Sequence, residues 1–483
     1  MRGYVIAGIV GTWVVMAALL VQKQTRPAGP SLTTLPATAF DERDEWFGVY
    51  KASSKIGYAH RTTARTSEGY AFSEESTMAV AMLGVPQTLR LSLTAETDQA
   101  FALRRLRFVL ISPATVFTVT AEREDQQLRV RYGPRGQETT MTFPLTEPIY
   151  LPSTLRPRVL AAELAPGTRY TAPSFNPLTL RNEPLTIIVE SRELLPGADG
   201  AIDAVRLIEE QQGIRTRTWL DTTGAVVREE SALGFTIERE TRERALVGAN
   251  NQATIDLVAA SRIPLVGTID DPRQVEQLRL RVSGAAAAQV PPDPPRQRVE
   301  GSTVTVTRED EPAAALPIAT VSQGVDPVYV APAPFIESDD PMVLARARAI
   351  VGDAGDAVTA ARRLVAWVNE HIVKAPSVTV PSAREVLSAA RGDCNEHAVL
   401  LTALARAVGI PARVVAGTVY AGDGFYYHAW TELWLGSWVS ADGVFGQLPT
   451  DATHIKLIDG GPERHLALAS VIGQLAFAVE EER

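Results

Sequence analysis

The sequence predicts an α+β protein in which a β-rich part precedes a part that combines helices with an antiparallel sheet. Two observations carry this prediction. Between residues 44 and 250, short apolar or alternating segments recur between turn signals, as the strands of an antiparallel sheet do. Between residues 335 and 442, apolar residues first recur at helical spacing and then form strand-like runs. The length of 483 residues allows two or three domains with separate cores.

The N-terminal segment is long and apolar enough to cross a membrane. Residues 3–21 carry no charged side chain, and a bilayer-spanning helix needs about 20 predominantly apolar residues. We therefore expect residues 1–22 to be an uncleaved transmembrane anchor, followed by a linker over residues 23–43. The alternative is a cleaved signal peptide, for which residues 16–18 offer a cleavage site. The rest of the chain is expected outside the cytoplasm, on the periplasmic side of an inner membrane.

The β-rich part, residues 44–250, is expected to form a half-barrel or a curved antiparallel sheet. Its residues 46–50 and 55–58 resemble the half-barrel and partial-barrel domains of bacterial envelope proteins. Such a domain either binds a peptide, polymer or lipid, or serves as a spacer between the membrane and the C-terminal part, and fold class does not decide between these roles. The expected strands are residues 89–94, 103–111, 115–122, 128–132, 139–143, 185–190, 204–210, 215–221 and 226–239.

Residues 251–334 are expected to connect the β-rich part with the helical part. They include residues 283–295, a stretch so rich in alanine and proline that it favours a loop or an extended spacer over a strand. At the other end of the chain, residues 466–483 are expected to form a C-terminal tail.

Three helices are expected between the connecting region and the only cysteine. Two of them should span residues 341–351 and 356–373. The first follows an aspartate and begins with Pro341, a favourable combination at a helix start. The third should begin near Ser382, which stands three residues before Glu385 at the spacing of a capping box.

Charge and cysteine content exclude several classes of protein and site. The formal net charge is −9, with mixed signs and no basic tract, so we expect no nucleic-acid partner. The single cysteine is Cys394, so no cysteine pair supports a zinc site. It also lies too far along the chain to carry a lipoprotein anchor. We expect neither a metal nor a cofactor.

Cys394 stands where cysteine chemistry is expected. It opens a run with helical periodicity that continues to Val408. Backbone N–H groups and the positive end of a helix favour the thiolate and can lower a cysteine pKa from ~8.5 to about 3.5–7.5. We therefore expect Cys394 to be a nucleophile with a lowered pKa. The alternative is a small buried hydrophobic residue, a common role for free cysteines.

Two residues further along complete the set that covalent cysteine catalysis needs. His428 lies in the strand-like run of residues 425–434, and Asp442 ends the run of residues 438–442. The turn between these runs predicts a hairpin, which would bring both side chains to neighbouring positions. Cys394, His428 and Asp442 then supply a nucleophile, a base and a carboxylate that orients the base.

Four motifs in this order resemble the bacterial transglutaminase-like domain. They are GDCNEHA at residues 392–398, LARAVGIPAR at residues 404–413, YHAWTE at residues 427–432, and Asp442. The resemblance covers about a quarter of the chain, and we place the domain at residues 335–465. It implies a papain-like cysteine-protease core in which Cys394, His428 and Asp442 form a catalytic triad.

One position departs from the pattern of this family. Its members commonly carry proline and a small polar residue after the aspartate, whereas Gly443 and Val444 follow Asp442 here. Glycine leaves the backbone freer than other residues do. We therefore expect Asp442 to be aimed less firmly at His428 than in relatives.

Three further residues are candidates for the surroundings of the site. His397 follows Cys394 by one helical turn, and we expect it to pack behind the catalytic groups rather than to bind a metal. Trp430 and Trp434 share the face of His428 on an alternating strand. They either wall a substrate groove or belong to the core. The remaining histidines are expected to be incidental: His60, His371, His454 and His465.

Together, these features predict an extracytoplasmic, membrane-anchored cysteine enzyme that acts on peptide or side-chain amide bonds of a protein or peptide. An acyl group held on Cys394 would pass to water or to an amine. We expect hydrolysis rather than crosslinking, since nothing in the sequence encodes an amine site or calcium ligands. The rival prediction is a non-catalytic envelope scaffold or binding protein with a vestigial triad.

Overall fold

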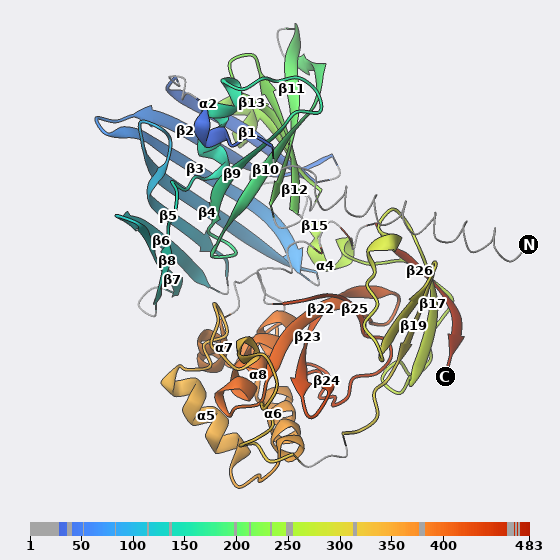
Figure 1. Cartoon of the computed structure of the whole chain (residues 1–483). Coiled ribbons are helices and arrows are strands. Elements are labelled where there is room, and N and C mark those ends of the chain that lie inside the picture. The colour runs from blue at the N-terminus through green and yellow to red at the C-terminus, as the bar shows by residue number, and fades with distance from the viewer. Residues whose placement is uncertain are drawn as a thin grey trace, which may run out of the picture.

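The structure is a computed structural model in which three parts can be distinguished: a large curved sheet, a five-stranded sheet, and helices on a four-stranded sheet (Figure 1). No helix among the described residues is long and apolar enough to cross a membrane, and the apolar residues 3–21 lie outside them. The described residues are 29–35, 41–247, 255–460, 468, 471 and 474–483, with gaps at 52, 83, 114, 135–137, 198–199, 212–213, 232–233, 313–315 and 376–381.

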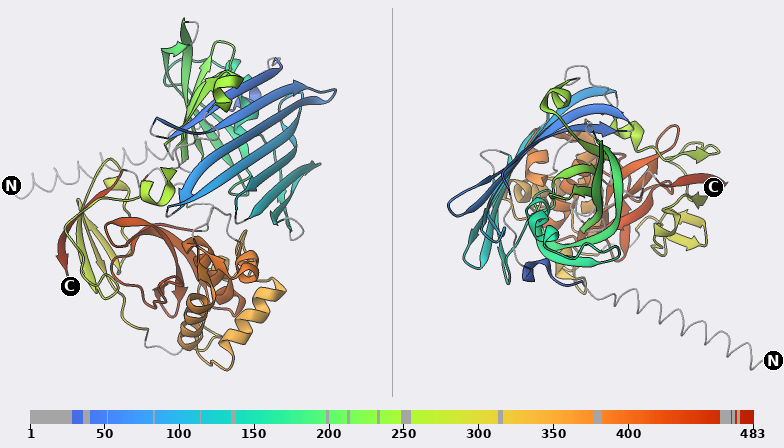
Figure 2. Two further views of the ribbon diagram at one scale, coloured as in Figure 1. Left: turned by 180° about the vertical axis from the view of Figure 1, so that it is seen from behind. Right: turned by 90° about the horizontal axis from the view of Figure 1, so that it is seen from above.

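The largest part is a sheet built almost entirely from antiparallel hairpins that follow one another along the chain, which confirms the predicted β-rich N-terminal part. Its first strand, β1, pairs with β14, so the two halves of the sheet join in the middle. Figure 2 shows how strongly the strands curve. The helix α2 (Pro152–Leu160) connects the halves, and β15 (Ile255–Asp256) adds to β3 in parallel. The other strands are β1 (Arg43–Lys51), β2 (Ser54–Arg65), β3 (Gly69–Met82), β4 (Val85–Asp98), β5 (Leu103–Ile111), β6 (Val116–Glu124), β7 (Gln127–Pro134), β8 (Thr139–Pro144), β9 (Arg169–Asn176), β10 (Arg181–Gly197), β11 (Gly200–Gln211), β12 (Ile214–Asp221), β13 (Val226–Glu230) and β14 (Phe235–Glu240).

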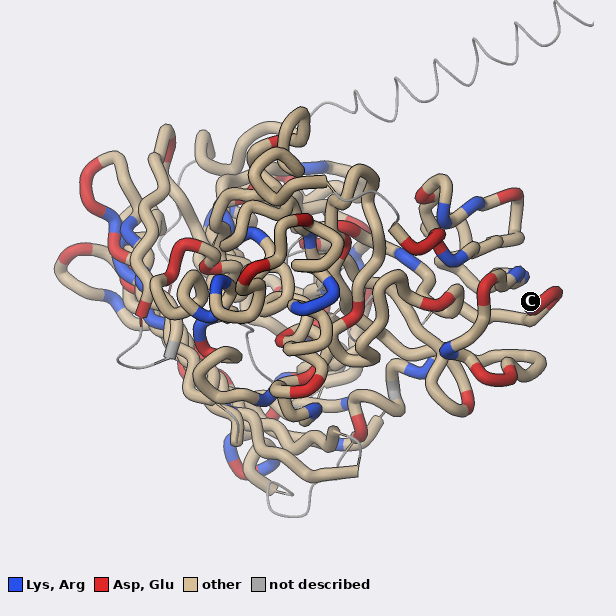
Figure 3. Tube along the Cα trace, turned by 90° about the horizontal axis from the view of Figure 1, so that it is seen from below, with Lys and Arg blue, Asp and Glu red and all other residues tan. Residues whose placement is uncertain are grey.

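Alternation along the strands gives this sheet one apolar and one polar face. Phe108 of β5 pairs with Val119 of β6, and both are buried. At the next position along the same ladder, the exposed Arg107 pairs with Thr120. Figure 3 shows that acidic and basic residues are interspersed over the described part of the chain. The alternation of apolar and polar residues with a period of two, from which the strands were predicted, therefore also shows which face of the sheet is buried.

The C-terminal part packs helices on a four-stranded antiparallel sheet in the order β24-β23-β22-β25. The helix α8 lies against β23, where the Thr431 hydroxyl donates to the Ala398 carbonyl at 3.0 Å. The predicted capping box of α7 is absent because the Ser382 hydroxyl donates to Glu337 instead, at 2.7 Å. The elements are α5 (Pro341–Val351), α6 (Ala357–His371), α7 (Ala383–Ala389), α8 (Cys394–Ala407), β22 (Ala412–Tyr420), β23 (Phe425–Trp434), β24 (Trp438–Ala441) and β25 (Ile455–Asp459).

Phe335 attaches the C-terminal part to the large sheet. It precedes α5 but is 1% exposed within the core of the sheet, where its ring centre lies 5.5 Å from that of Tyr132 and 6.3 Å from that of Phe117. Nearby, the Thr115 hydroxyl donates to Glu385 of α7 at 2.8 Å. Full burial of a phenylalanine side chain contributes about 1.5–3 kcal/mol. The two parts are therefore held together by packing.

The five-stranded sheet joins two segments that were expected to be a connecting region and a tail. Its order is β16-β26-β17-β19-β18, so the C-terminal strand β26 lies between strands of the connecting region. Of the expected loop at residues 283–295, Ser283 ends β17 and residues 284–295 lie between β17 and β18, with a short 3-10 helix η2 (Ala287–Gln289). The strands are β16 (Leu265–Val266), β17 (Gln277–Ser283), β18 (Gln297–Glu300), β19 (Thr303–Thr307) and β26 (Ala476–Glu482).

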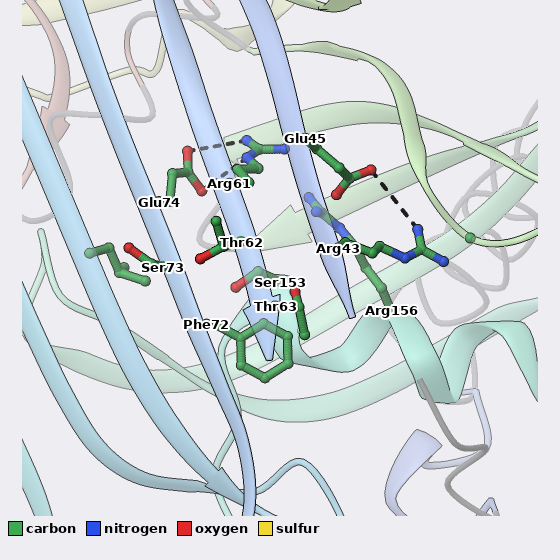
Figure 4. A pocket seen from close by; sticks show the side chains of 12 residues that line it. Arg43, Glu45, Arg61, Thr62, Thr63, Phe72, Ser73, Glu74, Ser153 and Arg156 are labelled. Carbon is green, nitrogen blue, oxygen red and sulfur yellow. Dashed lines mark hydrogen bonds and ion pairs between the residues drawn. The ribbon is translucent and has the colours of Figure 1, made fainter. Parts of the chain in front are cut away.

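A group of charged side chains lies inside the large sheet, beside a cavity of about 30 Å³ (Figure 4). Arg61 and Arg156 both pair with Glu229, and Arg61 also lies 3.1 Å from Glu74. Burial by itself would raise the pKa of Glu229, but the two arginines lower it to about 2. Glu209 differs, because burial, helped by the charge of Glu229, raises its pKa to about 7 despite the arginines.

Replacing Glu209 by glutamine should stabilise the protein at alkaline pH. Its folded-state pKa of about 7 lies above the ordinary value of 4.5, so its favourable contribution is present below that ordinary value and is lost as pH rises through about 7. A neutral amide avoids this loss. Glu209→Gln should raise the free energy of unfolding by about 1–3 kcal/mol near pH 8.5, and by much less near pH 4.5.

Urea unfolding at both pH values checks this prediction. Glu210→Gln is the matched control, because the Glu210 carboxylate pairs with Arg215 at the surface. The control should show no comparable gain at alkaline pH. An effect of Glu209→Gln that does not depend on pH would contradict the assignment.

Candidate active site

Cys394 is the first residue of α8 and is partly buried. The helix starts here because Asp393 caps it: the Asp393 carboxylate accepts from the Asn395 N–H at 2.8 Å, and Glu396 accepts from the Asp393 N–H at 2.9 Å. This capping box consists of two carboxylates. The N–H groups and the positive helix end, which would favour a thiolate, therefore have acidic partners already.

The pKa of the Cys394 thiol is raised well above its ordinary value. Burial is the main cause, and the charges of Asp393, Glu396 and Asp442 add to it. A hydrogen bond from the Ala429 N–H acts in the opposite direction but is outweighed. The prediction that the helix start lowers this pKa is therefore wrong, because the negative charges and the burial reverse the effect. At the start of α8, the thiol form of Cys394 is therefore favoured over the thiolate.

The hairpin brings His428 and Asp442 together. Thr431 pairs with Ala441 across β23 and β24, so Asp442 stands diagonally opposite His428 on the same face. The distance from His428 Nε2 to Asp442 Oδ2 is 2.6 Å, and both side chains are buried. Since Nε2 is occupied in this way, Nδ1 is the nitrogen that remains for a thiol.

The Asp442 carboxylate is held by four donors. Oδ1 accepts from the backbone N–H groups of Val444 at 2.6 Å and Phe445 at 3.1 Å, and Oδ2 accepts from His428 and from His454. Burial by itself would raise the pKa of Asp442, but the charge of His428 and the hydrogen bonds of both histidines hold it far below its usual range. The expectation of a loosely aimed aspartate does not agree with this geometry.

Close packing explains why position 443 is a glycine. A Cβ at this position would lie 2.7 Å from Cγ1 of Val368 in α6 and 3.7 Å from Cβ of His397 in α8. The turn after Asp442 therefore rests directly on two helices. Glycine here permits close approach, and the contact restrains the turn rather than freeing it.

The thiol lies beside the strand that carries His428. The residues on either side of His428 both contact the first turn of α8: Ala429 through the thiol, and Tyr427 by donating its hydroxyl to Asn395 at 2.6 Å. Among the described residues, no hydrogen bond joins the Cys394 thiol directly to His428. Catalytic hydrogen bonds are commonly long without substrate and shorten when it binds.

His454 is a member of this cluster that sequence reasoning missed. It was expected to be incidental, but it is fully buried, with Nε2 at 3.0 Å from Asp442 and Nδ1 at 3.2 Å from Asp451. Asp451 in turn accepts from Arg273 at 2.8 Å and from Gln447 at 2.9 Å. The only signal in the sequence was an Asp-x-x-His pattern shortly after Asp442.

His428, Asp442 and His454 also place one possible ligand atom each within 4.8 Å of one another, as a metal centre would. Their distances fit hydrogen bonds better. Asp442 Oδ2 lies 2.6 Å and 3.0 Å from the two Nε2 atoms, whereas ligands on a tetrahedral zinc stand roughly 3.3 Å apart. We therefore treat the group as a hydrogen-bonded cluster.

The remaining predicted residues lie around the cluster. His397 is 1% exposed, and its ring nitrogens face the backbone carbonyls of Asp393 at 2.7 Å and Ile372 at 3.3 Å. Trp430 is also 1% exposed, and its ring packs against the rings of both His428 and His454. Trp434 lies at the far end of β23 against Trp438, away from His428.

Of the other histidines, His60 pairs with Asp44 at 2.7 Å, His371 stacks on Trp367, and His465 lies outside the described residues. Among the residues that the structure describes, His397, His428 and His454 are the buried histidines.

The five-stranded sheet supports the segment that carries Asp451 and His454. Arg296, which is 6% exposed, donates to the Asp451 carbonyl at 2.7 Å and to the Thr450 carbonyl at 3.4 Å. Arg273 precedes β17, pairs with Asp451, and stacks over the ring of Phe445 at 4.2 Å. The connecting region is thus part of the framework of the site.

Residues 344–443 match the model of the transglutaminase-like superfamily, which confirms the predicted transglutaminase-like domain there. No curated protein matches the chain. A β-barrel-like protein of unknown function from Brucella abortus is 14% identical over 42% of this chain and 96% of its own, with a TM-score of 0.34. A candidate cysteine protease from Cytophaga hutchinsonii is 16% identical over 46% of this chain and 85% of its own, with a TM-score of 0.29. A candidate protease from Parabacteroides distasonis is 12% identical over 82% of this chain and 69% of its own, with a TM-score of 0.22.

Substitution of Gly443 tests the packing behind Asp442. Because Val368 is buried and stiff at χ1, it cannot easily move away from a new Cβ. Gly443→Ala should therefore lower the free energy of unfolding by about 1–3 kcal/mol. Adding Val368→Ala should recover part of this loss, as a double-mutant cycle of thermal unfolding would show.

Gly355→Ala is the control, since a Cβ there would meet nothing within 4 Å. It should leave the unfolding midpoint nearly unchanged. Additive effects of Gly443→Ala and Val368→Ala would mean that this contact does not restrain the turn.

Proposed function

We propose that the protein is a thiol-dependent hydrolase of amide bonds in proteins or peptides, with Cys394 as nucleophile, His428 as base and Asp442 as the group that orients the base. The observation that carries the proposal is the buried His428–Asp442 pair beside the helix that begins with the single cysteine. The match of residues 344–443 to the transglutaminase-like superfamily supports a role as a cysteine enzyme.

In this mechanism, His428 Nδ1 takes the thiol proton while sulfur attacks the carbonyl carbon, whose oxygen becomes negatively charged. The Cys394 N–H is the candidate donor to this oxygen, since it lies at the start of α8. His428 then gives the proton to the leaving amine, and a thioester remains on Cys394. Water, deprotonated by the same histidine, cleaves the thioester to a carboxylic acid and restores the thiol.

The raised pKa of Cys394 makes the base indispensable, because a thiol that is protonated at neutral pH is a weak nucleophile. We take water as the acceptor of the acyl group, since transfer to an amine requires an additional bound substrate. Crosslinking remains the competing outcome, and it would appear as incorporation of an added primary amine into the product.

A second candidate function is a non-catalytic scaffold with a vestigial triad. The observation that favours it is the same raised pKa, since a protonated, partly buried thiol is also what an inert cysteine shows. The two candidates differ in whether His428 changes the reactivity of Cys394.

His428→Ala should slow the alkylation of Cys394 by iodoacetamide near neutral pH by at least about tenfold, because the thiol loses its base. The measurement is the labelling rate of the folded full chain, with Cys394→Ser as the unlabelled control. His371→Ala is the matched histidine control, because His371 is exposed and stacks on Trp367. Equal labelling rates in the parent and in His428→Ala would favour the scaffold.

We also propose that residues 1–22 hold the enzyme at a membrane, with the rest of the chain outside the cytoplasm, on the strength of the uncharged residues 3–21. The large sheet would then be a spacer or a binding module beside the membrane. A reporter that is active only outside the cytoplasm, fused after residue 40, should be active, and it should be inactive when residues 1–22 are removed. Activity of a cytoplasm-only reporter in the first fusion would overturn the topology.

A further inference from the structure

His454 is enclosed between two buried carboxylates. Its Nε2 lies 3.0 Å from Asp442 Oδ2 and its Nδ1 lies 3.2 Å from Asp451 Oδ1, and all three side chains are buried. An ionised carboxylate only accepts hydrogen bonds, and a neutral imidazole donates from one nitrogen alone. Both contacts are satisfied together only when His454 is the doubly protonated imidazolium.

The alternative, a protonated aspartate, is disfavoured by the other donors. Asp451 accepts from Arg273 and Gln447, and Asp442 accepts from His428 and two backbone N–H groups. Burial by itself would raise the pKa of both aspartates. His454, followed by Arg273 and Thr453, keeps the pKa of Asp451 far below the usual range, and His428 and His454 do the same for Asp442. Burial would likewise lower the pKa of His454, but its bonds to Asp442 and Asp451 leave it raised.

We propose that His454 is a positioning residue of the triad: as a buried cation, it fixes the oxygen of Asp442 that His428 uses and offsets part of the charge of this carboxylate. The inference rests on the proposed function. The ring centres of the two histidines are 5.5 Å apart, so a proton on His428 would be repelled by the charge on His454. In the proposed mechanism, this repulsion favours release of the proton that His428 takes from Cys394.

The remaining groups around His454 agree with this assignment. Arg296 contacts the carbonyl oxygens of His454 at 3.5 Å and Asp451 at 2.7 Å, and its own charge is paired with Glu309. The rings of Trp430 and Phe445 form the uncharged walls. Among the described residues, the titratable groups that face the His454 ring are thus the two aspartates and His428.

The experiment is the pH profile of Cys394 alkylation by iodoacetamide in the full chain. His454→Gln keeps a donor near Asp442 but removes the charge, so the midpoint of the profile should move to higher pH by about 1 unit or more, as expected for two charges at this separation. His397→Gln is the matched control. It removes an equally buried histidine whose ring faces backbone carbonyls, and it should leave the midpoint in place.

The outcomes separate this inference from the function on which it rests. If His428→Ala leaves the pH profile of alkylation unchanged, His428 is not the base of Cys394. The proposed triad and the role of His454 then both fail. A profile that responds to His428→Ala but has the same midpoint in His454→Gln and the parent would overturn the role of His454 alone.

A second measurement applies even if His454→Gln does not fold. In the His428→Ala chain near pH 8, histidines with an ordinary pKa of about 6.5 are neutral. His397, whose ring faces neutral carbonyl oxygens and whose pKa is lowered by burial, is neutral there as well. Nitrogen NMR of labelled histidine side chains should then show one remaining imidazolium, that of His454. A spectrum with none would overturn the assignment of a permanent charge to His454.

Discussion

The burial of the Asp442 carboxylate is the constraint around which the site is organised. A buried charge is unfavourable by several kcal/mol unless donors and opposite charge replace the water that it loses. Here, four donors come from three places: His428 on β23, the backbone of the turn after β24, and His454 before β25. Each of these segments must hold its position for the carboxylate to stay satisfied. The close contact of Gly443 with α6 adds a further restraint on the turn.

This arrangement extends beyond the residues that match the transglutaminase-like superfamily. The match ends at residue 443, whereas His454, Asp451 and the two supporting arginines lie outside it. Arg273 and Arg296 come from the segment that precedes the helices, and their sheet is completed by the C-terminal strand β26. A fragment cut at the borders of the match would therefore lack the groups that hold Asp442 from behind.

The charge around Cys394 is negative, whereas the charge held on His454 is positive. Burial, helped by the negative charge of the capping box, keeps Cys394 protonated, whereas the aspartates on the other side hold a positive charge on His454. In the proposed mechanism, the thiol is therefore activated at the moment of attack rather than stored as a thiolate. The same charges that stabilise the start of α8 thus make the reactivity of Cys394 depend on His428.

The sequence by itself determined the features that depend on short-range patterns. The spans of α5, β22 and β23 agree with the predicted ones because helix caps and strand alternation act over a few residues. The pairing of His428 with Asp442 was predictable because a single turn separates their strands. The capping box of α7 was predicted in the same way, but it lost Ser382 to a competing partner, Glu337, from a distant segment.

Only the tertiary structure decided the features that depend on distance through space. The sheet that joins β17 with β26 pairs segments separated by almost the whole C-terminal part, and no local pattern identifies such partners. The direction of the Cys394 pKa was mispredicted because burial and three carboxylates outweigh the helix end. The position of His454 between Asp442 and Asp451 arises from the path of a loop held by two distant arginines. Sequence patterns report the period of burial, whereas charge interactions depend on distances that exist only in the folded chain.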